Sequence, residues 1–208
     1  MDEAAVLKRA SAIYLDVTVT TWMRRGRSLT LIEPNLRTKL TTAGFTVVRE
    51  ESQPHELILK VDYKETQGKR FRVDTFGTDI TCVIDLEHAE LGSLLNLTIR
   101  ESSGSVSTGT PPYLEALERF EANPYYYFLA EIIRGRVVAQ RDITEGLIHG
   151  LNDLLVAQAR GGRQRGADHG LTSEDMLYAT LARENTIEEL GRLKDRRAVP
   201  LLTGLLDH

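Results

Sequence analysis

The stretch AIYLDVTVT, residues 12–20, constrains the fold more than any other part of the sequence. Its apolar residues alternate with more polar ones, which is the period of a β-strand with one buried face. The apolar set is Ile13, Leu15, Val17 and Val19. Because such a face needs a second layer against it, the sequence predicts a sheet that begins near the N-terminus and is covered on one side.

A helix and four more strands are expected next. The helix is placed from about Glu33 to Ala43, because Pro34 opposes a regular helix on its N-terminal side. Gly44 suits the position just after a helix end. The further strands are expected at residues 45–49, 57–63, 78–87 and 94–100. Short sequential connections favour antiparallel pairing, so we predict an α+β fold with a mostly antiparallel sheet of about five strands and helices packed on one face.

Helical signals replace strand signals after about residue 110. Thr110 can cap a first helix, and Asn123 followed by Pro124 suits the start of a second one. Gly135 suits the end of that helix. Apolar side chains on one stripe predict a third helix over residues 143–155.

A change in composition then divides the chain. Residues 157–172 are rich in Gly and Arg, contain a single large apolar residue and predict a linker. Two more helices are expected, at about residues 173–190 and 196–206. The expected organisation is an α/β domain over residues 1–156, the linker over 157–172 and a helical pair over 173–208.

The charge and the hydropathy exclude some classes of partner. A net charge of −4 and a pI near 5.8 lack the basic footprint of a nucleic-acid-binding protein. The basic stretches MRRGR and ARGGRQR could contact phosphates or acidic lipids, although solvated loops are the simpler interpretation. No apolar run of about 18 residues suggests an integral membrane segment, and the N-terminus is too charged for a signal peptide. We expect a cytoplasmic protein, or a periplasmic or cell-envelope one if a targeting segment was removed.

No cofactor or metal site is expected from the sequence. Cys82, the single cysteine, cannot form an intramolecular disulfide and lies on the apolar face of a predicted strand, which favours an inert core thiol. The five histidines lack the spacing of metal ligands. Residues 104–110 resemble a P-loop in their glycine spacing, but the phosphate-binding lysine is absent.

The C-terminal stretch TIEELGRLKDRRAVPLLTGLLDH resembles a HEAT repeat, particularly the bacterial type found in phycobilisome-lyase-related proteins. Asp195 can cap the second helix of the repeat. The resemblance implies a scaffold or interaction surface, and a single repeat must dock on its own chain, pair with another chain or continue into further repeats. A plain helical hairpin that closes the domain is the alternative.

The N-terminal part resembles the small α/β modules of bacterial cell-envelope assembly proteins, including the N-terminal domain of TolB. The stretches that carry this resemblance are TTAGFTVV, HELILKVDYKE and GTDITCVIDLEHAELGSLL. It implies a role in envelope assembly, which a fold analogy alone does not establish.

Without a coherent catalytic motif, the sequence favours a non-catalytic protein-binding or scaffold protein. Its expected partner is another protein, or a second copy that associates through the C-terminal helices. The candidate contact residues are Tyr125, Tyr126, Tyr127, Leu201, Leu202, Leu205 and Leu206. The alternative is an enzyme whose site is assembled from distant residues near strand ends, for which Asp62, Asp85 and His88 are the candidates.

Overall fold

The chain divides into two compact units, Met1–Phe120 and Glu121–His208, called here the sheet unit and the helical unit. The computed structural model describes residues 6–7, 9–22, 28–72, 74–104, 110–161 and 173–206. Residues 121–156, which the sequence placed with the sheet, group with the C-terminal helices in this division.

The sheet unit contains a five-stranded mixed sheet in the order β2-β1-β3-β4-β5. The strands are β1 (Ala12–Thr20), β2 (Thr46–Val48), β3 (Leu57–Arg72), β4 (Thr75–His88) and β5 (Gly92–Ser102). The α+β class is confirmed, but β1 pairs in parallel with both β2 and β3, and only β3–β4 and β4–β5 are antiparallel. The expected antiparallel pairing is therefore wrong at the start of the sheet, because the helical crossover between β1 and β2 lets these two strands run in the same direction.

That connecting helix, α2, spans Ser28–Thr42 and includes Pro34, which the sequence analysis placed at its start. Its buried stripe of Ile32, Leu36 and Leu40 has helical spacing, and packing along that stripe offsets the cost of one internal proline. Gly44 ends the helix as predicted, with a φ of +95°.

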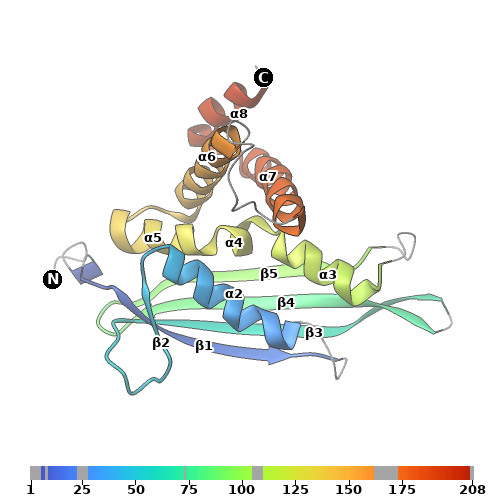
Figure 1. The fold of residues 1–208 in the computed structure, drawn as a ribbon, viewed down its shortest axis with the longest axis horizontal. Coiled ribbons are helices and arrows are strands. Elements are labelled where there is room, and N and C mark those ends of the chain that lie inside the picture. Colours follow the sequence, from blue (N-terminus) through green and yellow to red (C-terminus); the bar gives the residue numbers. More distant parts are fainter. Residues whose placement is uncertain are drawn as a thin grey trace. The chain divides into compact units, whose positions relative to one another are not determined.

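Helices α2 and α3 (Pro112–Glu121) lie over the same face of the sheet (Figure 1). That face carries the alternate apolar side chains of β1, β3, β4 and β5, most of which are almost fully buried, while Val17 and Val19 of β1 are half-buried. Tyr63 of β3 meets Phe120 of α3 edge to face, with ring centroids 5.0 Å apart. The predicted burial of one sheet face by helices is thus confirmed.

The helical unit begins with α4 (Pro124–Tyr127) and α5 (Leu129–Ala139). The predicted N-cap is confirmed, because the Asn123 side chain accepts a hydrogen bond from the Tyr125 backbone N–H at 3.1 Å. The predicted stop at Gly135 is wrong. The helix continues to Ala139 and ends at Gln140, which adopts the left-handed conformation at φ 54°.

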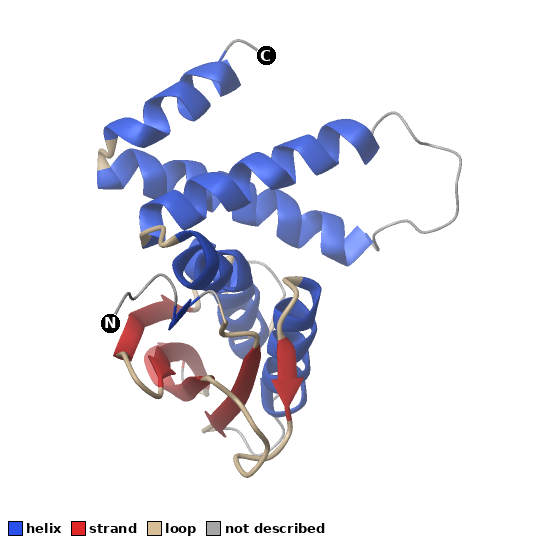
Figure 2. Ribbon diagram, turned by 90° about the vertical axis from the view of Figure 1, so that its left-hand side faces the viewer, coloured by secondary structure: helices blue, strands red, loops and turns tan. Residues whose placement is uncertain are grey.

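The remaining elements are α6 (Ile143–Gly161), α7 (Ser173–Leu193), the 3₁₀ helix η1 (Arg196–Ala198) and α8 (Val199–Leu206). The first two are the long helices of the unit and pack side by side (Figure 2). Helix α6 extends five residues into the expected linker, and residues 162–172 lie outside the described part of the chain. None of the helices in the described ranges combines the length and the apolar character that crossing a membrane requires.

Candidate functional site

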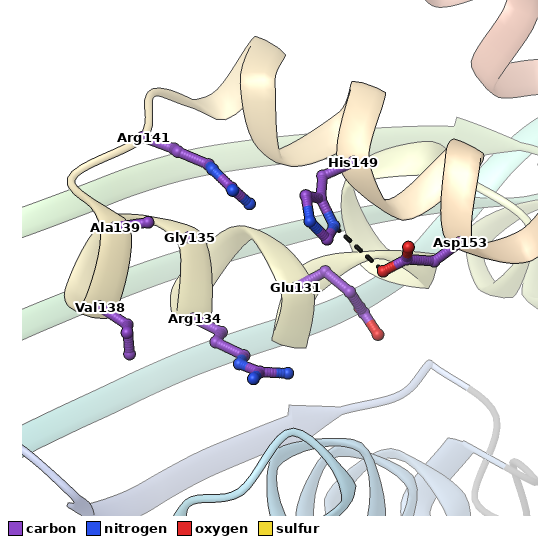
Figure 3. Close-up of a pocket in the computed structure, with 8 residues that line it drawn as sticks. All are labelled: Glu131, Arg134, Gly135, Val138, Ala139, Arg141, His149 and Asp153. Carbon is purple, nitrogen blue, oxygen red and sulfur yellow. Dashed lines mark ion pairs between the residues drawn. The ribbon is translucent and has the colours of Figure 1, made fainter.

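A shallow groove between α5 and α6 lies in the helical unit and is lined by several charged side chains. Its volume is about 230 Å³, and Figure 3 shows Arg141 and His149 pointing into the space between the two helices. The lining residues are Glu131, Arg134, Gly135, Val138, Ala139, Arg141, His149 and Asp153. A wider depression continues past Arg141 and His149 to Arg197.

His149 and Asp153 lie one helical turn apart in this groove. The distance from His149 Nδ1 to Asp153 Oδ2 is 3.0 Å, which is within ion-pairing range. Both side chains are exposed, and the lining set of the groove offers no Ser, Cys, Lys or Tyr as a nucleophile. No group of three or more His, Cys, Asp or Glu in the described ranges could hold a metal ion. The H-x-x-x-D spacing on a predicted helix is the sequence signal for this pair, which was not among the predicted site residues.

An arginine connects the groove to the last helices. Arg197 of η1 lies 2.8 Å from Asp142 and 2.9 Å from Glu145, at the start of α6, and 2.6 Å from Asp195. Asp142 and Glu145 also cap α6 reciprocally, since the backbone N–H of each donates to the carboxylate of the other. The D-x-x-E spacing signals such a capping box, so this helix start was readable from the sequence.

The charges of this cluster shift the pKa values of its members. Hydrogen bonds from the guanidinium and the backbone N–H of Arg197 lower the pKa of Asp195 to about 2. Partial burial opposes ionisation of Asp142, but the Glu145 backbone N–H and Arg197 outweigh it and lower the pKa. Asp195 is also the N-cap of η1, as predicted, because its side chain accepts from the Arg197 backbone N–H at 2.9 Å.

The three predicted contact tyrosines differ in their surroundings. Tyr126 is buried, whereas Tyr125 and Tyr127 are half-buried. The Tyr125 hydroxyl donates to Glu189 of α7, and Glu189 also accepts two hydrogen bonds from Arg192. Burial first, and the Glu189 carboxylate next, raise the pKa of Tyr125 to about 12. Tyr125 therefore joins α4 to α7, and a role for the three tyrosines in partner contact stays a prediction.

The predicted contact leucines lie on α8. Leu201, Leu202 and Leu205 are half-buried, and the side chain of Leu206 lies outside the described part of the structure. Val199 begins the helix and is 55% exposed. The most extensive contacts of α8 are with η1, directly before it. Val199 and the half-buried leucines therefore leave part of the apolar surface of α8 open to solvent.

The candidates for an assembled enzyme site do not converge. Asp62 and Asp85 lie on the open face of the sheet, while His88 lies on the opposite face and is buried. Asp85 accepts a hydrogen bond from Asn96, and His88 Nδ1 accepts one from the Glu90 backbone N–H at 3.1 Å. Asp85 and His88 are thus engaged locally in structural contacts.

A buried polar cluster that was not predicted from the sequence lies between α2 and β3. Glu65 is 4% exposed, and its Oε1 accepts hydrogen bonds from Ser28 Oγ at 2.5 Å and from the Tyr63 hydroxyl at 2.8 Å. Ser28 is the first residue of α2. Burial first, and the Glu65 carboxylate next, raise the pKa of Tyr63. The cluster fixes the start of α2 on the sheet.

These features define an α+β protein with a mixed sheet and a separate helical unit, and comparison with known proteins adds only distant similarities. No family model and no curated protein matches the chain. Lipoprotein GNA1162 from Neisseria meningitidis aligns at 11% identity and a TM-score of 0.37, covering 53% of this chain and 94% of its own. Protein XCC0632 from Xanthomonas campestris aligns at 12% identity and a TM-score of 0.35, covering 62% of this chain and 84% of its own. Neither alignment carries a functional argument, and none of the comparisons supports the HEAT-like resemblance.

Proposed function

We propose that the protein is a non-catalytic association module that pairs with a second copy of itself through α8. The observation that carries the proposal is the partial exposure of this helix, whose sequence VPLLTGLL is almost entirely apolar. Val199 is more than half exposed, and none of the described α8 side chains is fully buried. Contiguous apolar surface of this kind is typical of a contact site.

The charges beside α8 favour a second copy as the occupant. Lys194 and Arg196 precede the helix and are exposed, while Asp207, which lies outside the described residues, follows it in the sequence. If two copies of α8 pack antiparallel about a twofold axis, the basic end of each helix faces the acidic end of the other. A helix of eight residues is about 12 Å long, so the leucines of both copies can meet along its whole length.

The test is the oligomeric state of the full chain with Leu202→Gln and Leu205→Gln combined. We expect the wild-type chain to form dimers by native mass spectrometry and by light scattering at increasing concentration. The dissociation constant of the double variant should be higher by roughly a hundredfold or more, because the two substitutions remove four leucines from each dimer interface. The matched control is Leu29→Gln, which changes a leucine of α2 that is 47% exposed.

A monomeric wild-type chain would overturn self-association. If a purified heterologous protein then bound the wild-type chain and not the double variant, the surface would belong to that partner instead. A place in cell-envelope assembly is a further part of the proposal, and it rests on the resemblance of the N-terminal stretches alone. Fractionation of cells that express the complete gene, with the protein recovered from the envelope, is the measurement that supports or contradicts it.

A further inference from the structure

The hairpin of β3 and β4 extends beyond the rest of the sheet. The last pair that joins β1 to β3 is Thr20–Lys64, and the last pair that joins β5 to β4 is Ser102–Asp79. Residues 67–72 and 74–78, named here the ribbon tip, therefore form a two-stranded extension with no third strand beside it among the described residues. Figure 1 shows this extension at one end of the sheet.

The ribbon tip is basic on a chain whose net charge is −4. Lys69, Arg70 and Arg72 are exposed, against the exposed acidic residues Asp74 in the tip and Asp79 directly after it, whose carboxylate lies beside Gly68. Salt screens the interaction between exposed charges that are more than about 10 Å apart. A ligand that touches the ribbon tip therefore interacts mainly with the basic side chains there, and less with the acidic remainder of the chain. The tip thus presents positive charge to whatever it touches.

Aromatic side chains accompany these charges. Phe71 and Phe76 are half-buried, and the guanidinium of Arg70 lies 5.7 Å from the centroid of the Phe76 ring. A β-carbon at Gly77 would lie 3.1 Å from the Phe71 ring, so the glycine lets this ring pack on the opposite strand. The rings of Phe71 and Phe76 therefore each pack against another residue of the ribbon tip.

Trp22, at the end of β1, belongs to the same end of the sheet. Its Nε1 donates to Thr78 Oγ1 at 3.2 Å, at the base of the ribbon tip, and its side chain is 37% exposed. Because it is the single tryptophan of the chain, its fluorescence reports on this end of the sheet alone.

We propose that the ribbon tip binds the surface of a bilayer that contains anionic phospholipids. Lys and Arg are attracted to the lipid phosphates, and aromatic rings are favoured at the depth of the headgroups. A convex two-stranded protrusion can rest on an extended surface, whereas a bound peptide needs a groove or a sheet edge to enclose it. The ribbon tip lies in the sheet unit, so this binding is independent of self-association through α8.

The test uses the full chain and vesicles of equal parts phosphatidylcholine and phosphatidylglycerol. We expect sedimentation with these vesicles, a blue shift of Trp22 fluorescence and loss of binding at high salt. Combining Lys69→Gln with Arg72→Gln should weaken binding about 30-fold, because each basic residue near an anionic surface contributes roughly fivefold to the affinity. Arg70 is left unchanged because it contacts Phe76 and the Arg72 carbonyl.

The matched control combines Arg9→Gln with Arg49→Gln, two exposed arginines near the other end of the sheet. It removes the same charge and should bind almost as the wild-type chain does. Thermal unfolding checks that both double variants fold. Equal binding to pure phosphatidylcholine, no binding to the anionic vesicles, or equal weakening in the control would overturn the proposal. So would binding to single-stranded or duplex nucleic acid without binding to vesicles, which would assign the tip to that class of ligand.

Discussion

Gly150 of α6 lies directly against the ring of Phe128, the residue between α4 and α5. A β-carbon at position 150 would be 2.5 Å from Phe128 Cδ1 and 2.8 Å from Cγ. No real β-carbon sits that close to a buried ring, so the absence of a side chain at Gly150 sets how closely α6 can approach Phe128.

Replacing Gly150 with Ala should therefore destabilise the helical unit by about 1–3 kcal/mol, the usual cost of overpacking a buried contact. The measurement is urea unfolding of the full chain followed by far-ultraviolet circular dichroism. The control is Gly191→Ala in α7, where nothing lies within 4 Å of the added carbon. That change should stabilise by up to about 1 kcal/mol through helix propensity. Equal effects of the two changes would contradict the packing argument.

Arg197 should determine the pKa of Asp195. That pKa lies near 2, chiefly because the Arg197 guanidinium donates hydrogen bonds to the carboxylate. A carboxyl with a lowered folded pKa stabilises the fold above its unfolded value, about 4, and the contribution is lost as the pH falls through the folded value. In Arg197→Met we expect the pKa of Asp195 to rise toward the ordinary value and acid unfolding between about pH 4 and 2 to depend less on pH.

The pKa change is measured by NMR titration of the Asp195 carboxyl carbon. Arg196→Met is the control, because Arg196 is an exposed neighbour and its replacement removes the same charge. An equal rise of the Asp195 pKa in both variants would mean that general charge, and not the hydrogen bonds of Arg197, sets its value.

The cluster around Glu65 should contribute measurably to the stability of the sheet unit. Tyr63→Phe removes a hydroxyl that donates to Glu65 Oε1 at 2.8 Å inside the core. We expect a loss of about 1–3 kcal/mol in the free energy of unfolding, because the carboxylate stays buried with one donor fewer. Tyr14→Phe, on the open face of the sheet, removes a hydroxyl outside the core and should change stability by less than about 0.5 kcal/mol.

Ser28→Ala removes the other donor to Glu65, 2.5 Å away. A double-mutant cycle of Ser28→Ala and Tyr63→Phe should show coupling, since both hydroxyls share one acceptor atom. Additive losses would show that the two hydrogen bonds act independently.

Cys82 should be unreactive in the folded protein. Burial raises the pKa of its thiol to about 12, so the reactive thiolate is scarce at neutral pH. A thiol reagent such as dithionitrobenzoate should label no cysteine in the native chain and one after denaturation. Because Cys82 pairs with Tyr63 and Ile99 in the middle of the sheet, its labelling rate measures opening of the sheet unit. Rapid labelling under native conditions would contradict the buried position.

Local patterns in the sequence were reliable wherever neighbouring residues decide the structure. The alternation of AIYLDVTVT placed β1 with both of its ends, and Asn123 and Asp195 capped the helices they were expected to cap. The prediction of the α+β class followed from such patterns. Strand lengths were underestimated, because the stretch from Thr66 to Arg72 has no buried side chain and is held by pairing with β4.

The tertiary structure decided what no local pattern contains. The position of β1 between β2 and β3 depends on where α2 packs, and Pro34 stays helical because the stripe of α2 is buried. Glu65 meets Ser28 across 37 residues of sequence, and Arg197 meets Asp142 across a gap that includes two helices. Such contacts form only when distant segments are folded together, because the free energy of burying apolar surface, and not the spacing of residues, selects which segments meet.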